Sequence, residues 1–399
     1  MKLAIVACIA SVLLACPEKT LVVIEAQTSH VHAHVQTYSF CPGMPVVPSG
    51  TSLGKQAIAT AESLRRYPRQ TIARVLHEMA IPGALVAVVG TDGWRNESIE
   101  TPEAVYALMR EEVVSLGGYT PLVFSSIDGE REAVYAWFGA NFVAGAFSMD
   151  GVRDHPVLRV EERKTSVCYR VSADIKEYPD VHEVSFLGET YFLRQKSYEL
   201  GLQAGRDRLL GEAPINKVAV VKHRSRAELE RVQRAHACLW KGETMIHQEY
   251  LYIGQMDSFD GCVEWIKTSL MFERAGVREL FDSAGVLAGM DAGGMVFALG
   301  KLRELLEDRI TSRDAREHAS TTLQLLKWQL DGICGPGYRA FMKTPLDRSF
   351  CTDAGFMYAF LMYGLELEET LLLWPLDRIG SFSAQWPLGM GMVELQSFQ

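Results

Sequence analysis

Three histidines alternate along a short segment near the N-terminus, His30, His32 and His34. We predict an extended strand over residues 28–35, and alternate side chains of a strand point to the same face. Imidazoles in a His-x-His arrangement can bind zinc, so one candidate function is a zinc-dependent hydrolase. Three ligands so close on one strand fit tetrahedral geometry poorly, and the competing interpretation is a polar strand that faces solvent.

A carboxylate precedes this segment at the end of an apolar run, where a charged side chain is unusual. Glu25 ends the apolar run 21–24, which we predict to be a buried strand. Burial of an acid is costly unless it is paired, so Glu25 either serves a ligand or caps nearby backbone amides. The hydroxyls of Thr28 and Ser29 follow it and can donate hydrogen bonds to a phosphate.

The elements that would position these residues alternate between strand and helix. Short apolar and β-branched runs predict strands at 21–24, 28–35, 85–89 and 122–124. Helices are predicted in the same part of the chain at 54–66, 70–79, 101–115 and 130–142. A strand-rich stretch follows at 145–192, and later helices are predicted at 198–210, 296–309 and 352–363. The alternation is typical of an α/β fold.

Length and composition narrow the class of protein. The chain has 399 residues, which suggests two or three domains, and it is 48% hydrophobic and 22% charged, as globular proteins are. The net charge of −9 and the absence of a basic run argue against a nucleic acid polymer as partner.

The N-terminus has the pattern of a targeting segment. Lys2 precedes an apolar run over residues 3–15, which is too short to span a bilayer but suits a signal peptide. We predict a signal peptide or lipoprotein signal over residues 1–19, in which the sequence up to Cys16 resembles a lipoprotein box. The expected location is secreted or extracytoplasmic, either free or lipid-anchored at Cys16, with no membrane span after signal removal.

The cysteine content agrees with export. Six cysteines lie beyond the N-terminal segment, and an even number in an exported protein predicts disulfides. They are Cys41, Cys168, Cys238, Cys262, Cys334 and Cys351. No two of them form a CxxC arrangement, which argues against a zinc ribbon.

Several segments resemble, in order, the motifs of one enzyme family. VVIEAQTS at 22–29 is similar to its first phosphate motif, and VGTDGWR at 89–95 to its second motif. GEREAVYAW at 129–137, CTDAGFMY at 351–358 and WPLG at 386–389 are similar to three later ones. The family is that of the apyrases, the ecto-nucleoside triphosphate diphosphohydrolases.

This resemblance implies a fold and an activity. The fold would be α/β, with two ribonuclease-H-like lobes of the actin-like ATPase type and a nucleotide cleft between them. The lobes would cover residues 20–144 and 145–375, and residues 376–399 would return to the N-terminal lobe. The partner would be a nucleoside tri- or diphosphate, which loses its terminal phosphate to an attacking water. The cofactor would be a divalent cation, Ca²⁺ or Mg²⁺.

The resemblance also assigns roles to individual residues. Glu132 falls on the family's general base, which accepts a proton from the attacking water; otherwise it is an exposed acid in the first turn of a helix. Glu25 stands where the family has an aspartate that orients metal-bound water. Thr91 and Arg95 keep a hydroxyl and a basic residue of the second motif, where the hydroxyl holds water or phosphate or merely caps a turn.

The second phosphate motif departs furthest from the family's pattern. Aligned without gaps, it falls on residues 148–155, where Ser148 replaces the aspartate that serves the metal. A shift of two residues lets Asp150 take the metal role and leaves Gly151 in the phosphate loop. Arg153 then either clamps a phosphate through its guanidinium or belongs to a solvated turn.

Two further features follow from the resemblance. Phe356 falls where family members stack an aromatic ring on the nucleobase, although aromatic residues of such a helix also build cores. The family's disulfides imply the pairs Cys238–Cys262 and Cys334–Cys351, and they leave the other cysteines unassigned.

Three functions therefore stay open at the level of sequence. The first is an exported nucleotide phosphohydrolase, which the match at Glu132 favours. The second is a catalytically impaired relative that binds a nucleotide or a protein partner, which the altered second phosphate motif favours. The third is the zinc hydrolase of the histidine strand.

Overall fold

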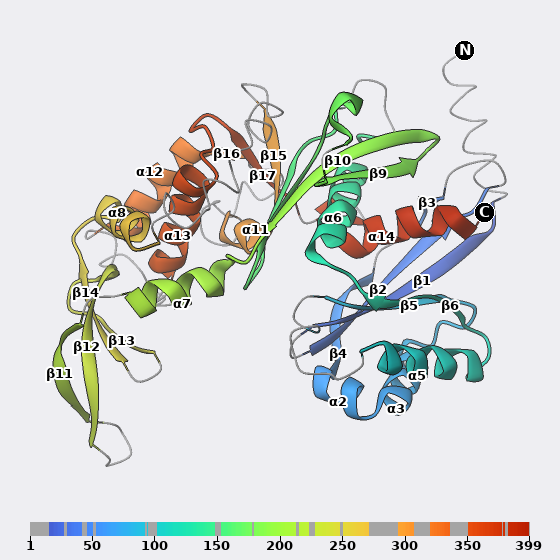
Figure 1. Cartoon of the computed structure of the whole chain (residues 1–399), viewed down its shortest axis with the longest axis horizontal. Coiled ribbons are helices and arrows are strands. Elements are labelled where there is room, and N and C mark those ends of the chain that lie inside the picture. The colour runs from blue at the N-terminus through green and yellow to red at the C-terminus, as the bar shows by residue number, and fades with distance from the viewer. Residues whose placement is uncertain are drawn as a thin grey trace. The chain divides into compact units, whose positions relative to one another are not determined.

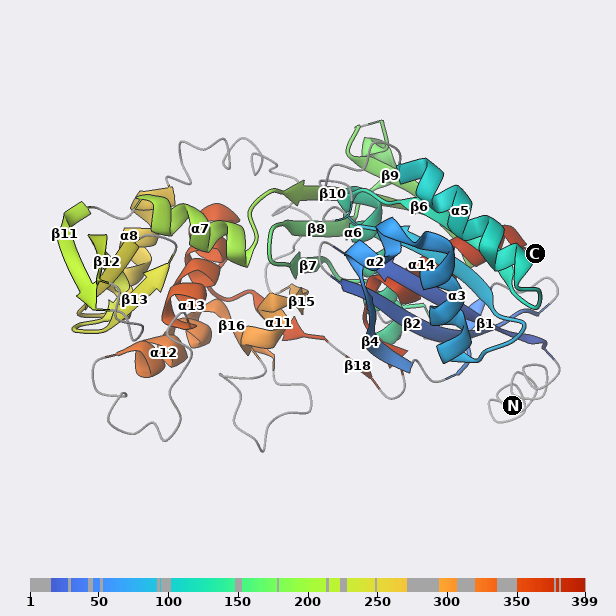
Figure 2. The ribbon, with the colours of Figure 1, turned by 90° about the horizontal axis from the view of Figure 1, so that it is seen from below.

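The computed structural model describes residues 16–27, 30–41, 46–50, 53–91, 94, 102–147, 153–177, 179–212, 215–222, 228–247, 250–270, 294–306, 320–335, 350–376, 378–379 and 382–398. The chain divides into two compact units (Figure 1, Figure 2). Unit 1 contains Met1–Val157, Ser166–Ser197 and Asp377–Gln399, and unit 2 contains Leu158–Thr165 and Tyr198–Leu376. Both units combine helices with β-sheet, so the predicted α/β fold class is confirmed.

A six-stranded sheet forms the centre of unit 1, with the order β3-β2-β1-β5-β6 and β4 paired to β2. Its strands are β1 (Glu18–Ala26), β2 (His30–Ser39), β3 (Val47–Pro48), β4 (Leu53–Thr60), β5 (Leu85–Gly90) and β6 (Thr120–Ser126). Strands β1, β5 and β6 are parallel, whereas β2 is antiparallel to β1. The parallel strands therefore end at one edge, where Ala26 is paired with Gly90 and Gly90 with Ser126.

Helices cover both faces of this sheet (Figure 1). One face carries α2 (Ala61–Arg66), α3 (Pro68–Met79) and α5 (Pro102–Ser115), and the other carries α6 (Gly129–Val143) and α14 (Trp386–Glu394). Alternate residues of β1 and β5 meet the first three helices in a fully buried core, which includes Val22, Ile24, Val86, Val88, Leu64, Ile72, Val75 and Met109. Strands covered on both faces have continuous apolar sequences, which is why the runs at 21–24 and 85–89 predicted these strands correctly.

Helices α6 and α14 touch through their backbones. A Cβ added to Gly389 would lie 1.8 Å from the carbonyl oxygen of Tyr135 and 2.8 Å from the backbone nitrogen of Gly139. The Tyr38 hydroxyl also donates to the Leu388 carbonyl oxygen at 3.0 Å, which fixes α14 against β2. A segment that follows all of unit 2 in the sequence therefore completes unit 1.

Gly389→Ala is expected to destabilise unit 1, because its methyl group would overlap the Tyr135 carbonyl and push the two helices apart. Overpacking of this kind costs about 1–3 kcal/mol, so calorimetry should show a thermal midpoint lower by several degrees. Gly332→Ala in α12 (Leu323–Cys334) is the matched control, because its Cβ would meet nothing within 4 Å. An unchanged midpoint for Gly389→Ala would contradict the helix contact.

An aromatic cluster attaches two further strands of unit 1 to α6. These strands are β9 (Val181–Phe186) and β10 (Glu189–Tyr198). The ring of Phe138 lies 5.2 Å from that of Phe186, and the ring of Trp137 lies 5.8 Å from that of Tyr191. Residues 166–197 belong to unit 1 in this division, and the lobe boundary that the resemblance implies at residue 145 stays a prediction.

Unit 2 contains two groups of strands and five α-helices among its described residues. Four strands follow the order β16-β17-β15-β7: β16 (Thr321–Thr322), β17 (Leu372–Pro375), β15 (Met295–Gly300) and β7 (Val157–Val160). A four-stranded sheet has the order β11-β12-β14-β13, from β11 (Ile215–Lys222), β12 (Glu228–Trp240), β13 (Thr244–His247) and β14 (Tyr250–Met256). The helices are α7 (Leu202–Glu212), α8 (Phe259–Leu270), α11 (Lys301–Leu305), α12 and α13 (Phe350–Ala359). In the part of the chain that is described, no helix has the length and apolar character needed to cross a membrane.

Two predicted helices begin as strands. Residues 53–60 form β4, and α2 begins only after Thr60, whose side chain accepts the Ser63 N–H and caps the helix. Residues 295–300 form the strand β15, and Gly300, with φ 65°, ends it before α11. Apolar runs this short fit a buried strand as well as a helix, so spacing alone gave the wrong element.

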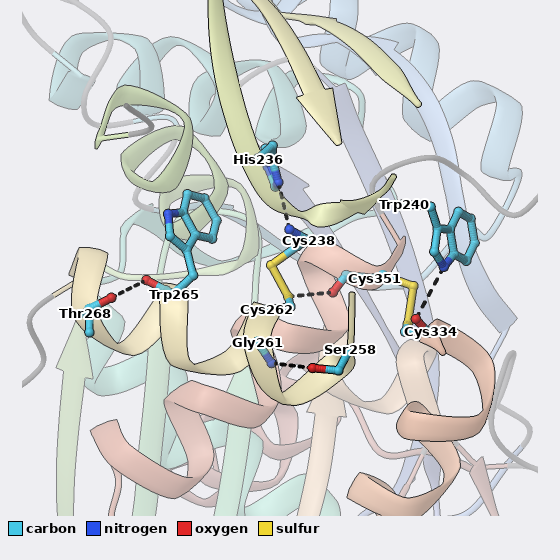
Figure 3. Close-up of a disulfide and its surroundings, with 10 residues drawn as sticks. All are labelled: His236, Cys238, Trp240, Ser258, Gly261, Cys262, Trp265, Thr268, Cys334 and Cys351. Carbon is cyan, nitrogen blue, oxygen red and sulfur yellow. Dashed lines mark hydrogen bonds between the residues drawn. A yellow bond between two sulfur atoms is a disulfide. The ribbon is translucent and has the colours of Figure 1, made fainter. Parts of the chain in front are cut away.

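Two disulfides connect the elements of unit 2 (Figure 3). Cys238 of β12 is bonded to Cys262 of α8, and Cys334 of α12 is bonded to Cys351 of α13. These are the two pairs that the resemblance implies. The Cys262 sulfur also lies 3.8 Å from the Cys351 carbonyl oxygen, so the two bonds are neighbours. Loops of this size stabilise the fold by about 3 kcal/mol each through the unfolded state.

A third disulfide corrects the interpretation of the N-terminal cysteine. Cys16 is bonded to Cys41, and β1 begins two residues after Cys16. A sulfur in a disulfide cannot also carry a thioether-linked lipid, so this bond favours the free form of the exported protein over the lipid-anchored one. Of the signal segment expected over residues 1–19, residues 1–15 lie outside the described residues, and Glu18 already begins β1. Cys168 is buried with a free thiol, and burial raises its pKa.

The ring of His236 is buried beside the Cys238–Cys262 disulfide. Its Nδ1 accepts the backbone N–H of Cys238 at 3.1 Å, and its ring centroid lies 4.9 Å from that of Trp265 (Figure 3). Burial lowers the pKa of the imidazole to about 4. The folded protein therefore keeps His236 neutral at pH 7, with the proton on Nε2.

This histidine is expected to make the protein less stable in acid. Below about pH 6.5 the unfolded chain binds a proton at His236 that the folded chain takes up only near pH 4, which costs about 2 kcal/mol between pH 7 and pH 5. Urea unfolding at both pH values should show that His236→Asn, which keeps an acceptor for Cys238, loses this part of the pH dependence. The exposed His77→Gln is the control and should retain it. Equal pH dependence in both variants would contradict the assignment.

Candidate active site

Two buried carboxylates and a hydroxyl lie at the edge where the parallel strands of unit 1 end. Glu25 is the penultimate residue of β1, Thr91 follows β5, and Glu132 lies in the first turn of α6, which follows β6. Glu25 and Glu132 are each 2% exposed, and Thr91 is 8% exposed. Because adjacent parallel strands present their carboxyl ends at the same edge, the topology brings these three residues to one edge of the sheet.

The β1–β2 hairpin orients the Glu25 carboxylate. The Gln27 Nε2 donates to Oε1 at 2.7 Å, and the His34 Nε2 lies 3.0 Å from Oε2. The turn is closed by the Gln27 N–H, which donates to the His30 carbonyl oxygen at 3.0 Å. These contacts supply the polar environment that a buried acid requires. The sequence did not indicate the role of Gln27, which stands where the resembling family has glycine.

The histidine strand does not form the zinc site considered from the sequence. His34 is buried against Glu25, whereas His30 is exposed. The rings of His30 and His32 lie 6.3 Å apart. Within the described ranges, no three histidine, cysteine or acidic side chains are arranged to hold a metal ion. His34 instead belongs to the surroundings of Glu25.

A glycine allows the chain to pass closely from β5 to Thr91. A Cβ added to Gly90 would lie 2.2 Å from the Tyr106 hydroxyl oxygen and 2.4 Å from the ring of Trp94. Thr91 is then tied to the end of β1, because its N–H donates to the Ala26 carbonyl oxygen at 3.1 Å. The second motif of the sequence therefore places its hydroxyl beside the end of the strand that carries Glu25.

The start of α6 fixes Glu132. Asp128 caps the helix, and the Glu132 N–H donates to the Asp128 carbonyl oxygen at 3.1 Å. The Ile127 N–H donates to the Gly90 carbonyl oxygen at 2.9 Å and ties this loop to β5. The positive end of the helix dipole favours a carboxylate in the first turn. Glu130, in the same turn, has a side chain that is 54% exposed, so the burial of Glu132 distinguishes it from an ordinary first-turn acid.

The donors at this edge fit a hard divalent cation. Glu25 supplies carboxylate oxygens, and oxygen ligands are those that Ca²⁺ and Mg²⁺ prefer. Mg²⁺ in phosphoryl-transfer sites commonly takes one or two carboxylates and completes its shell with water and substrate phosphates. Glu25 therefore fits as a ligand of the cation, and Glu132 stays available to accept a proton.

Several candidate residues stay predictions. Five lie outside the described residues: Thr28, Ser29, Arg95, Asp150 and Gly151. Arg153 is described and exposed, in a segment that Asn141 holds against α6 by donating to the His155 carbonyl oxygen at 3.0 Å. The exposure of Arg153 fits both a solvated turn and a phosphate contact.

Phe356 is a core residue of unit 2 and does not present a face to a nucleobase. Its ring is buried and stacks on Phe360 with centroids 5.9 Å apart. A Cβ added to Gly205 of α7 would lie 2.2 Å from the Phe356 ring, so the helix backbone covers the ring closely. The burial of the ring favours the alternative of a core aromatic over the stacking role that the resemblance implies.

A second hairpin turn has the same closing bond as the β1–β2 turn, whereas the second phosphate motif expected at 148–155 lies mostly outside the described residues and stays a prediction. The turn at 161–164 joins β7 to β8 (Thr165–Arg170). It is closed by the Glu161 N–H, which donates to the Lys164 carbonyl oxygen at 2.9 Å. The turn contains no glycine and consists of four charged residues between two short strands.

Comparisons with known proteins complete this description. Neither models of known protein families nor curated proteins match the sequence. Among solved structures, a nucleoside triphosphate hydrolase from Neospora caninum matches with a TM-score of 0.63 and 12% identity, covering 99% of this chain and 96% of that chain. The chain therefore shares the fold of this structure.

Two further structures match this hydrolase fold less well. A Ppx/GppA family member from Aquifex aeolicus has a TM-score of 0.48 and 10% identity, covering 96% of this chain and 99% of that chain. An exopolyphosphatase from Cytophaga hutchinsonii has a TM-score of 0.45 and 12% identity, covering 94% of this chain and 98% of that chain. The match to the Neospora caninum structure confirms, at the level of the fold, the resemblance to the apyrases that the motif order predicted, with a highly divergent sequence.

Proposed function

We propose that the protein is an exported phosphohydrolase that releases the terminal phosphate of nucleoside tri- and diphosphates. The observation that carries this proposal is the burial of Glu25 and Glu132 at the edge where β1, β5 and β6 end. Buried acids at the end of a sheet are costly for folding and are typical of sites that do chemistry. The hydrolase fold and the three disulfides, which form in oxidising compartments, support the same assignment.

In the proposed reaction Glu132 is the general base. It accepts a proton from a water molecule, whose oxygen forms a bond to the terminal phosphorus. The bond from that phosphorus to its bridging oxygen breaks, and the shortened nucleotide leaves with the electron pair. The Thr91 hydroxyl holds the water or a phosphate oxygen.

Glu25 is the proposed ligand of the divalent cation, with Gln27 and His34 fixing its orientation. The cation, when bound, supplies positive charge that neutralises the phosphate oxygens. Asp150 is proposed as a second carboxylate for it. Thr28, Ser29, Arg95, Gly151 and Arg153 are proposed phosphate contacts.

A phosphate-release assay tests this function directly. The purified chain would be incubated with ATP, ADP, GDP and UDP, each with Ca²⁺, with Mg²⁺ and with EDTA. We expect release with at least one nucleotide and metal, and none in EDTA. No release from any combination would overturn the proposal.

A catalytically impaired nucleotide-binding protein is the second candidate. It is favoured by Gln27, which donates to the Glu25 carboxylate from the position where the resembling family has glycine. Nucleotide binding that requires metal, without any phosphate release, would select this candidate over the hydrolase.

A further inference from the structure

Both oxygens of the Glu25 carboxylate take part in hydrogen bonds. The Gln27 Nε2 donates to Oε1 at 2.7 Å, and the His34 Nε2 lies 3.0 Å from Oε2. An ionised carboxylate can only accept, so a proton on the His34 Nε2 completes the second bond. The Glu25 side chain is 3% exposed, so little water competes with these two donors. Each carboxylate oxygen therefore faces a hydrogen that carries partial positive charge.

The backbone of the β1–β2 turn holds the Gln27 amide beside Glu25. The two residues are two positions apart, and side chains at this spacing on an extended chain point to the same face. The Gln27 N–H donates to the His30 carbonyl oxygen at 3.0 Å, which fixes Gln27 directly after β1. Gln27 is not among the described non-glycine residues with a positive φ, so its side chain is accommodated without backbone strain. The contact with Glu25 therefore belongs to the folded hairpin.

Ca²⁺ and Mg²⁺ make different demands on a carboxylate. Ca²⁺ takes about 6–8 oxygen ligands in a flexible arrangement and readily binds both oxygens of one carboxylate. Mg²⁺ is smaller, requires octahedral geometry and keeps several waters, so one oxygen of a carboxylate is enough for it. A cation that binds both oxygens of Glu25 must displace or oppose the hydrogens of Gln27 and His34. A cation that binds one oxygen leaves the hydrogen bond at the other oxygen in place.

We propose that Gln27 makes the cation site at Glu25 selective for Mg²⁺ over Ca²⁺, because its amide prevents the carboxylate from binding a cation through both oxygens. The amide is neutral, so it lowers the affinity for Ca²⁺ without cancelling the negative charge that attracts either ion. Glycine, which the resembling family has at this position, offers no such donor. The inference rests on the proposed function, because it takes Glu25 as the ligand of the cation.

The test measures the binding of Mg²⁺ and of Ca²⁺ to the metal-free full chain by calorimetry, with no nucleotide present. Gln27→Met removes the amide donor and keeps the length of the side chain. It should strengthen Ca²⁺ binding roughly 10–100-fold, which corresponds to the loss of one hydrogen bond to a charged group, and it should change Mg²⁺ binding much less.

Gln36→Met is the matched control for this variant. The Gln36 amide lies on β2 of the same hairpin, but it donates to the carbonyl oxygens of Thr37 at 2.9 Å and Gly50 at 3.0 Å. The control therefore loses a similar amide without changing a carboxylate. It should leave the ratio of the two metal affinities as in the wild type.

Two further variants assign the effect to the contact between Gln27 and Glu25. Adding Glu25→Gln to Gln27→Met should abolish the gain in Ca²⁺ affinity, because the effect of one partner vanishes when the other is absent. A gain that persists would place the effect on another ligand and overturn the proposal. Gln27→Ala should show the same gain as Gln27→Met. A gain in Gln27→Ala alone would make side-chain volume the cause and would also overturn it.

The outcomes separate this proposal from the proposed function. An equal ratio of Mg²⁺ to Ca²⁺ affinity in wild type and Gln27→Met would overturn the selectivity, even if the wild type releases phosphate from nucleotides. Tighter binding of Ca²⁺ than of Mg²⁺ by the wild type, or binding of neither ion, would also overturn it. A Ca²⁺ gain in Gln27→Met, with no phosphate release by the wild type, would refute the hydrolase and leave the selective cation site standing.

Discussion

Replacing Glu132 with glutamine is expected to lower turnover roughly 10²–10⁴-fold, the contribution that a positioned general base makes. Glutamine keeps the size and hydrogen-bonding reach of the side chain but cannot accept the proton. The change falls on a buried side chain in the first turn of α6, beside the end of β6. Initial rates at saturating nucleotide measure the loss, and nucleotide affinity should change little because the side chain acts on water.

Glu130→Gln is the matched control for this experiment. Glu130 lies in the same helical turn, but it is more than half exposed and lies 3.7 Å from His182. Its loss removes the same charge from the same helix end, so a general electrostatic effect would appear in both variants. Full activity in Glu132→Gln would show that the role carried over from the family is wrong at this position.

Replacing Glu25 with glutamine is expected to weaken the apparent metal affinity roughly 10–100-fold, as loss of a group that ligates or orients a metal does. The glutamine amide has the same size as the carboxylate and still reaches Gln27 and His34, but it carries no negative charge. Activity titrated with Ca²⁺ or Mg²⁺ should therefore require more metal and should recover in part at high concentration.

Glu18→Gln provides the control on the same strand. Glu18 begins β1 and is exposed, whereas Glu25 lies near the end of β1 and is buried. The control should leave the metal titration unchanged. A titration curve that is the same for Glu25→Gln and wild type would remove Glu25 from the metal site.

The sequence predicted the part of the fold that depends on apolar runs and motif order. The runs at 21–24 and 85–89 gave two central strands, and the helix at 130–142 carried Glu132 to the same edge as Glu25. These predictions succeeded because burial on both faces leaves a continuous apolar signal. The pairing of Cys238 with Cys262 followed from the resemblance and not from spacing.

Other features could not be predicted because the sequence fits two structures equally well. Phe356 lies in a helix of apolar residues, where a core aromatic and a ring that stacks on a base have the same neighbours in sequence. The second phosphate motif expected at 148–155 stays a prediction, because most of it lies outside the described residues. The disulfide of Cys16 could not be predicted, because the sequence left open whether this cysteine belongs to the signal segment or to the folded chain. The structure pairs it with Cys41.

The contact between α6 and α14 has a consequence for synthesis on the ribosome. Domains generally fold in the order in which they emerge, but the first unit of this chain needs residues 386–394, which emerge after the whole second unit. The surface of α6 at Tyr135 and Gly139 therefore lacks its contact with α14 while about 240 residues are translated. This takes roughly 12–48 seconds at typical rates. Unit 2 can fold during that time. The half-finished first unit must be kept from aggregating until α14 arrives, and its arrival is the step that completes the protein.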